Sequence, residues 1–284
     1  MTQHITPELR RWIVMQCEAG MPPEEIVRGM MASGWQEEVA RTALAQTLSG
    51  EGAEVQPPAV EAPPLTVGTV PEPLVQGVTS VMAEGHPVQV LMTLKLPRVV
   101  LFGGLLTPTE CDALIEEARP RLERSETVQL ATGGSEVNEA RTSDGMFFKR
   151  GESELVARIE RRIAALVRWP VTHGEGLQIL RYRPGAQYQP HFDYFDPAQS
   201  GTANMLKRGG QRVGTLVMYL NEPQGGGATT FPDSGLEIAP VKGQAVFFSY
   251  DRPHPSTGTL HGGAPVLAGE KWVATKWLRQ EVFE

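Results

Sequence analysis

The first 49 residues carry apolar positions at helical spacing. Thr6-Pro7-Glu8 is typical of a helix start, because it combines a hydroxyl cap with proline in the first turn. Gly20 ends this segment, and Ser33-Gly34-Trp35 interrupts the next one. The apolar stripe of the last segment consists of Val39, Ala43, Leu44 and Leu48. The pattern predicts three short helices, and therefore a small all-α module over residues 1–49.

These helices, with a Gly-Trp turn between the second and the third, resemble a ubiquitin-associated-type three-helix module. The resemblance implies a protein partner for this module. The alternative is a plain helical extension of the domain that follows, since short patterns often match by chance. The residues alone leave both interpretations open.

A proline-rich stretch follows the helical segment. Its prolines are Pro57, Pro58, Pro63, Pro64, Pro71 and Pro73. Proline at this density disfavours regular structure and is typical of an extended, semi-rigid linker. We therefore expect a linker over residues 50–87 and a second domain over residues 88–284.

The second domain begins with a strand-like run at Val99–Phe102, which two helical patterns and then further strand patterns follow. Thr107-Pro108-Thr109-Glu110 predicts the start of a helix that reaches Arg119, and residues 152–167 form a second amphipathic pattern. Short β-rich runs separated by Gly and Pro lie at 177–183, 215–221, 227–232, 236–243, 244–250 and 271–278. This order predicts a mainly β sandwich or barrel with flanking helices packed on one outer face.

Charge and cysteine content narrow the function classes. The formal net charge is -7, and no basic run occurs, so we expect no nucleic-acid partner. Cys17 and Cys111 lie far apart, which argues against a disulfide framework and fits a reducing cytoplasm. No apolar run is long enough for a transmembrane helix, and the first residues do not resemble a signal peptide. We expect a cytoplasmic protein with no membrane partner.

His191-Phe192-Asp193 is the first candidate site. In a strand, residues i and i+2 point to the same side, so His191 and Asp193 would share one face. A second histidine would complete a set of two histidines and one carboxylate, which leaves positions on Fe(II) for a 2-oxo acid and O2. The candidates are His254, which lies between two prolines, and His261, which precedes Gly262-Gly263. We favour His261 because a candidate ligand-binding lysine follows it.

That lysine is Lys271. Strand alternation places Lys271, Val273, Thr275 and Trp277 on one face. If this face is interior, the ammonium group needs an anionic partner, and alternation turns Glu270 away from it. The distal carboxylate of 2-oxoglutarate would be such a partner. The alternative places Lys271 on a solvent face and Lys276 inside, and the residues alone do not exclude it.

The stretch from Leu177 to Leu278 resembles the catalytic core of the prolyl 4-hydroxylases. The matching blocks are Tyr182, Tyr188–Tyr194, Arg212–Asn221, Gly226–Pro232, Leu260–Val266 and Gly269–Trp277. Arg141-Thr142-Ser143 upstream is also similar to that family. The blocks occur in the family's order over residues 95–280. Ala228 stands where the family usually has an acid, which we expect to alter a loop rather than the chemistry.

The resemblance implies a double-stranded β-helix, a jelly-roll and cupin-like form, for the second domain. It implies that iron is held by His191, Asp193 and His261. It implies that Lys271 pairs with the C5 carboxylate of 2-oxoglutarate. The hydroxyls implied in the same pocket are those of Thr215, which would assist Lys271, and Tyr182. The residues implied to line a substrate groove are Tyr188 and Trp277.

The implied activity is hydroxylation of a prolyl residue in a peptide or protein, coupled to oxidative decarboxylation of 2-oxoglutarate to succinate and CO2. The implied cofactors are Fe(II), 2-oxoglutarate as co-substrate, O2 and L-ascorbate. One alternative is a hydroxylase of a free amino acid or other small molecule. A second is a non-catalytic jelly-roll module that binds proteins. A third is a zinc hydrolase with the same three ligands, which gives Lys271 no role.

Overall fold

The computed structural model describes residues 5, 7–18, 20–49, 70–124, 127–128, 135–136 and 142–284. Two compact units divide the chain, Met1–Val60 and Glu61–Glu284. Arg141 and residues 50–69 of the predicted linker lie outside the described residues. Among the described residues, no helix is long and apolar enough to cross a bilayer.

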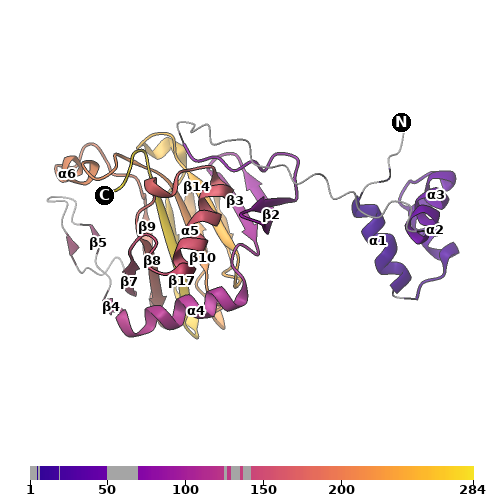
Figure 1. Ribbon diagram of the computed structural model, residues 1–284, viewed down its shortest axis with the longest axis horizontal. Helices are drawn as coiled ribbons and strands as arrows, with labels where there is room; N and C mark the ends of the chain where they lie inside the picture. The colour runs from indigo at the N-terminus through magenta and orange to yellow at the C-terminus, as the bar shows by residue number, and fades with distance from the viewer. Residues whose placement is uncertain are drawn as a thin grey trace. The chain divides into compact units, whose positions relative to one another are not determined.

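Three helices make up the described part of the first unit (Figure 1). They are α1 (Pro7–Glu18), α2 (Pro23–Ala32) and α3 (Glu37–Leu48). Their apolar positions meet in a small core formed by Ile13, Ile26, Val27, Met30, Ala40, Ala43 and Leu44. Burial of this shared apolar stripe stabilises helices that are too short to be stable alone.

The second unit is mainly β and antiparallel. A nine-stranded sheet has the order β1-β2-β3-β14-β10-β17-β8-β7-β4, and a four-stranded sheet has the order β13-β12-β15-β9. The large sheet consists of β1 (Ser80–Ala83), β2 (His86–Leu94), β3 (Arg98–Gly103), β4 (Glu123–Arg124), β7 (Asp144–Phe148), β8 (Leu177–Tyr182), β10 (Arg212–Tyr219), β14 (Ala245–Ser249) and β17 (Lys271–Arg279). The smaller sheet consists of β9 (Tyr188–His191), β12 (Thr229–Phe231), β13 (Leu236–Ile238) and β15 (His261–Gly263).

The remaining elements of the second unit are short and lie outside these two sheets. Two pairs of strands stand apart: β5 (Thr127–Val128) with β6 (Ser135–Glu136), and β11 (Gly225–Gly226) with β16 (Val266–Ala268). The short helix α6 (Thr202–Leu206) and the 3-10 turns Arg119–Arg121, Val171–His173, Pro232–Ser234 and Pro255–Thr257 complete the unit.

Two helices pack on the large sheet, and Figure 1 shows α5 in front of its strands. They are α4 (Pro108–Ala118) and α5 (Glu154–Val167), so both predicted helices are confirmed. Thr107 and Glu110 form a capping box at the start of α4. Glu110 also accepts two hydrogen bonds from the buried Arg162 of α5, at 2.7 and 2.9 Å.

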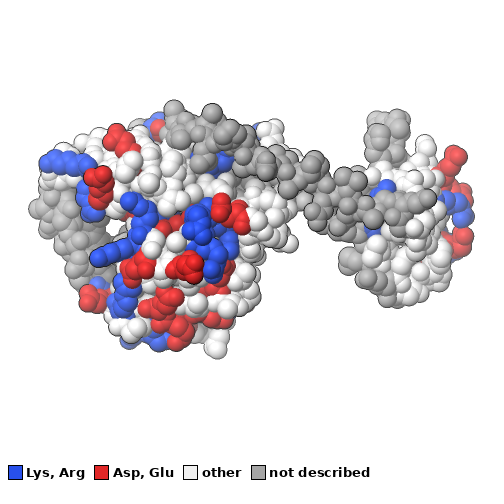
Figure 2. Space-filling view, in the orientation of Figure 1, with Lys and Arg blue, Asp and Glu red and all other residues white. Residues whose placement is uncertain are grey.

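The surface of the second unit carries charges of both signs. On the face shown in Figure 2, basic side chains lie among acidic ones.

The central strand β17 is buried on both of its faces. Trp272, Ala274 and Leu278 belong to the core that the helices cover. Lys271, Val273, Thr275 and Trp277 line a pocket on the other face, between the two sheets. The predicted alternation of β17 is therefore confirmed. The alternative that placed Lys271 on a solvent face is wrong, because Lys271 is only 4% exposed.

The expected start of the second domain at residue 88 needs correction. Strands β1 and β2 form an antiparallel hairpin that pairs Ala83 with His86, so residue 88 falls inside the sheet. The hairpin turns at Glu84-Gly85, where φ is 52° and 72°. Two positive φ values in a two-residue loop match the twist of the flanking strands. Val75 is also buried against the same core, so the ordered domain begins ahead of these strands.

Candidate active site

Three potential metal ligands meet at the open edge of the smaller sheet. In the register of β9 and β15, His191 pairs directly with His261, and Asp193 follows β9 in a bend. The Nε2 atom of His191 lies 3.5 Å from Asp193 Oδ1, and the Nε2 atom of His261 lies 3.4 Å from Asp193 Oδ2. One ligand atom from each residue lies within 4.8 Å of the others. The structure thus brings together the three predicted ligands.

Backbone carbonyls orient both imidazole rings. The Nδ1 atom of His191 lies 2.9 Å from the carbonyl oxygen of Gln189, and that of His261 lies 2.9 Å from the carbonyl oxygen of Thr259. A carbonyl oxygen can only accept a hydrogen bond, so each Nδ1 atom carries the proton. Each Nε2 atom then keeps a lone pair that can bind a metal ion. Such contacts commonly fix a histidine as a metal ligand.

The charges of the three residues suit a divalent cation. Burial alone would raise the pKa of Asp193, but His261, His191 and Arg212 outweigh it and hold the pKa far below its usual value. Burial lowers the pKa of His261 to about 4, against the opposing charge of Asp193. Near neutral pH the site therefore offers a carboxylate and an unprotonated imidazole, which are the forms that bind metal. The donor set fits Fe(II) with positions left for other ligands.

His254 does not contribute to this site. It is exposed, and its Nδ1 atom lies 2.9 Å from Ser256 Oγ in the 3-10 turn that follows it. Its ring accepts a hydrogen bond from the backbone N–H of Ser256 and so caps that turn. This geometry supports the preference for His261.

Lys271 lies in the same pocket. Its Nζ atom is 5.6 Å from the ring centroid of Tyr182 and 5.8 Å from that of Tyr219. Burial lowers the pKa of Lys271 to about 8. Within the described part of the chain no carboxylate forms an ion pair with it, and Glu270 instead accepts a hydrogen bond from Trp272 Nε1 at 3.1 Å. A buried ammonium without an acid needs an anionic ligand.

The prediction that Thr215 assists Lys271 needs correction. Thr215 pairs with Trp277 in the β10–β17 register, at the far end of the strand from Lys271. Six residues of strand separate the two positions by roughly 20 Å, which neither side chain can bridge. The hydroxyl of Thr215 instead donates to Asp193 Oδ2 at 2.7 Å.

Thr229 is the pocket threonine at the Lys271 end. It accepts a hydrogen bond from the hydroxyl of Tyr219 at 2.9 Å, and that ring lies beside the ammonium group. Gly227, two residues earlier, has a φ of 74°, and a side chain there would meet Cδ of Lys271 at 3.1 Å. The sequence did carry a signal for Thr229, because it follows the glycines of the block Gly226–Pro232.

Two aromatic residues, Tyr188 and Trp277, line the pocket. Tyr188 stacks on His191 with ring centroids 3.7 Å apart and planes inclined by 25°. The guanidinium group of Arg212 lies over the ring of Trp277, with Cζ 4.1 Å from the ring centroid. The implied role of Tyr188 and Trp277 in a substrate groove stays a prediction. Phe147 extends the aromatic surface, 6.4 Å from Trp277.

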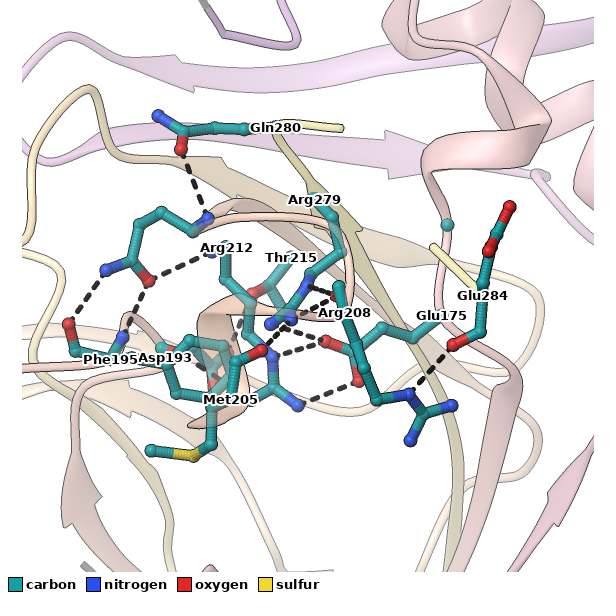
Figure 3. Close-up of polar contacts among 12 residues, drawn as sticks. Glu175, Asp193, Phe195, Met205, Arg208, Arg212, Thr215, Arg279, Gln280 and Glu284 are labelled. Atoms are coloured by element: carbon teal, nitrogen blue, oxygen red, sulfur yellow. Dashed lines mark hydrogen bonds and ion pairs between the residues drawn. The ribbon is translucent and has the colours of Figure 1, made fainter. Parts of the chain in front are cut away.

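A buried network of charges lies behind Asp193 (Figure 3). Arg212 donates to the two carboxylate oxygens of Glu175 at 2.7 and 2.9 Å, and to the carbonyl of Asp193 at 3.5 Å. Arg279 approaches the same carboxylate at 3.4 Å. Burial alone would raise the pKa of Glu175, but Arg212 and Arg279 lower it. These three charged residues were missed in the sequence analysis, although Arg212 opens one of the quoted blocks.

Known proteins resemble this chain over the same region. Residues 177–279 match the model of the 2OG-Fe(II) oxygenase superfamily. "Prolyl 4-hydroxylase 5" of Arabidopsis thaliana is 40% identical over 209 residues, which cover 66% of this chain and 70% of that protein. "Prolyl 4-hydroxylase 1" of the same plant is 42% identical over 202 residues, which cover 65% of this chain and 70% of that protein.

One solved structure is similar in both sequence and fold. It is the viral collagen prolyl hydroxylase from Paramecium Bursaria Chlorella virus-1, in its 2OG complex. That protein is 31% identical and superimposes with a TM-score of 0.50, over 64% of this chain and 95% of its own. The likeness supports a jelly-roll oxygenase fold for the second unit.

Proposed function

This chain belongs to the prolyl 4-hydroxylase family of Fe(II)- and 2-oxoglutarate-dependent dioxygenases, and we propose that it hydroxylates a prolyl residue within a peptide or protein. One observation carries the proposal. The pocket that gathers His191, Asp193 and His261 also holds Lys271, a buried ammonium group without an acid partner among the described residues. A metal set alone fits many enzymes, but this lysine also calls for an anionic co-substrate.

Each residue has a defined task in this proposal. His191, Asp193 and His261 would hold Fe(II), which, when bound with 2-oxoglutarate and O2, supplies the oxidising power for C–H hydroxylation. Lys271 would neutralise the distal carboxylate of 2-oxoglutarate. The hydroxyls of Tyr182 and Thr229, at the same end of the pocket, would complete its hydrogen bonds. The apolar neighbours Leu180, Val217 and Val273 exclude water from the reacting atoms.

The aromatic lining of the pocket supports a peptide rather than a free amino acid as the substrate. Tyr188 and Trp277 offer aromatic surfaces to an extended proline-rich chain, whose polyproline II shape costs little entropy to bind. Arg212, which packs on Trp277, is already paired with Glu175. It therefore offers no free charge to clamp the carboxylate of a free amino acid.

Incubation of the protein with Fe(II), 2-oxoglutarate and a short proline-rich peptide, and separately with L-proline, tests the proposal. Mass spectrometry of the products and a succinate assay are the readouts. We expect the peptide to gain one oxygen atom at proline and L-proline to remain unchanged. Oxygen gain on L-proline alone would show that the substrate is a free amino acid. Absence of succinate release with every substrate would favour a binding module.

We further propose L-ascorbate as the reductant that returns oxidised iron to Fe(II). The support for ascorbate is the family resemblance. Succinate formation without a prime substrate, measured with and without ascorbate, tests it. We expect turnover to stop early when ascorbate is left out.

A further inference from the structure

Asp193 is supported by a buried chain of hydroxyl groups. Thr215 Oγ1 donates to Asp193 Oδ2 at 2.7 Å, and the same Oγ1 atom lies 3.0 Å from the hydroxyl of Tyr250. Thr215 is completely buried, and Tyr250 is 2% exposed. The three residues come from separate segments: Asp193 from the bend after β9, Thr215 from the strand β10, and Tyr250 from the position just after β14.

The direction of these hydrogen bonds follows from the chemistry of the groups. An ionised carboxylate can only accept, so the single hydroxyl proton of Thr215 points to Asp193. Thr215 must then accept from the hydroxyl of Tyr250. Hydrogen bonds aligned in one direction strengthen each other at low dielectric, so Tyr250 reinforces the bond that reaches Asp193.

The backbone gives Asp193 little support of its own. The residue stands in a bend just beyond β9, where the ladder with β15 has ended. Both of its carboxylate oxygens face imidazole nitrogens, at 3.5 and 3.4 Å, so rotation of the carboxylate would change which oxygen meets the metal. The bond from Thr215 restrains this rotation, and Arg212 holds the carbonyl of the same residue (Figure 3).

We propose that Thr215 and Tyr250 are a positioning pair that fixes the carboxylate of Asp193 for metal binding. The proposal rests on the metal centre described under the proposed function and adds a role for two residues that do not belong to the ligand set. It gives a role to the hydroxyl that β10 carries at Thr215, a position far from Lys271.

Metal affinity, measured by anaerobic titration calorimetry with Fe(II) and repeated with Mn(II), tests the pair. Co-substrate is absent, so the readout does not depend on turnover. We expect Thr215→Val to weaken metal binding by about 10–100-fold, the usual effect of losing such an outer partner. Thr215→Ser keeps the hydroxyl and should restore affinity to within a few-fold of the unaltered protein. Tyr250→Phe should weaken binding by less than Thr215→Val.

Thr229→Val is the matched control, because it removes a hydroxyl at the other end of the same pocket. It should raise the 2-oxoglutarate requirement and leave the affinity for metal alone unchanged. An unchanged metal affinity in folded Thr215→Val, or a Thr215→Ser as weak as Thr215→Val, would overturn the positioning role. If Thr215→Val does not fold, an unchanged affinity in Tyr250→Phe has the same force. Unchanged affinity in Asp193→Ala would instead overturn the metal centre itself.

Discussion

Two lysines on β17 are almost equally buried, yet their surroundings differ completely. Lys271 is 4% exposed and Lys276 is 2% exposed, on opposite faces of the strand. The ammonium group of Lys276 contacts the carboxylate of Glu160 and the carbonyl of Glu175. No described residue offers Lys271 an acid, and the faces of Tyr182 and Tyr219 lie near its Nζ atom.

The difference supports a structural role for Lys276 and the proposed co-substrate role for Lys271. Burial lowers the pKa of both lysines, but for Lys276 the charge of Glu160 opposes the shift. The fold therefore completes the charge pair on the helix-covered face by itself. On the pocket face the charge pair stays incomplete until an anion binds, which is the property expected of a co-substrate site.

The largest effect on the pocket face should come from the metal ligands. His191→Ala, Asp193→Ala and His261→Ala should each abolish turnover, because each removes one donor of a three-residue set. Succinate release and metal content are the measurements. His254→Ala is the control and should keep most of the activity, since that side chain only caps an exposed turn. Survival of activity in His261→Ala with its loss in His254→Ala would reverse the ligand assignment.

Substitution of the two lysines by methionine should sharpen the comparison most directly. Loss of one partner of a buried charge pair costs about 3–5 kcal/mol. Lys276→Met leaves Glu160 buried and unpaired, so the free energy of unfolding should fall by about that amount. Lys271→Met should lose no stability, because it removes an unpaired buried charge, and should raise the KM for 2-oxoglutarate by about 100–1,000-fold, which corresponds to the same energy.

Denaturant unfolding and the KM for 2-oxoglutarate, measured on both variants, check this crossed pattern. Lys271→Arg should not rescue the KM, because the planar guanidinium group needs a different space. A normal KM in Lys271→Met, or a large loss of stability in that variant, would show that both lysines are structural.

Sequence reasoning succeeded where a local rule determines the geometry. Strand alternation has a fixed period of two, so it identified the face of β17 that carries Lys271 and Trp277. The same rule grouped His191 with Asp193, and the two side chains do meet, although Asp193 lies in a bend after β9 and not in the strand that the rule assumes. The capping signal at Thr107 likewise marked the start of α4.

It failed where the position depends on contacts between distant segments. Thr215 and Thr229 both stand in family-like blocks, but only the register of β10 against β17 shows which of them lies near Lys271. The pair of Glu175 with Arg212 joins two segments through a buried contact that no periodicity encodes. The hairpin at Glu84-Gly85 was missed because the linker was extended to residue 87, well past the last of its quoted prolines at Pro73.

The pH dependence of co-substrate binding should be a moderate effect of the same asymmetry. Burial lowers the pKa of Lys271 from 10.5 to about 8, so the free protein loses this positive charge as the pH rises through that value. The dissociation constant of 2-oxoglutarate should therefore increase above pH 8. Calorimetry on either side of that pH measures it, with Lys271→Met as the control that should lack this step.

Lys271 should affect the stability of the fold in the opposite direction: as the pH rises, co-substrate binding weakens while the free energy of unfolding increases. Its pKa is near 10.5 in the unfolded chain and about 8 in the folded protein. Between these values the unfolded chain binds more protons, so this group makes the protein more stable as the pH rises through that window. A difference in unfolding free energy between the unaltered protein and Lys271→Met that stays constant across the window would contradict the low pKa.

The smallest effect is expected from removal of residues 1–69. Every pocket-lining residue lies at Leu180 or beyond, and both lysines of β17 find their surroundings within the second unit. A chain that begins at Val70 should therefore keep the kcat and KM of the full chain on a short proline-rich peptide.

A chain that begins at Val88 should be less stable than the chain from Val70. It retains every proposed ligand, but it lacks β1 and the buried Val75. Thermal unfolding and peptide hydroxylation of the two shortened chains, compared with the full chain, make the test. A chain from Val70 that folds but does not hydroxylate the peptide would show that the first unit takes part in catalysis. The surroundings of Lys271 and Lys276 in the second unit would then be insufficient for activity.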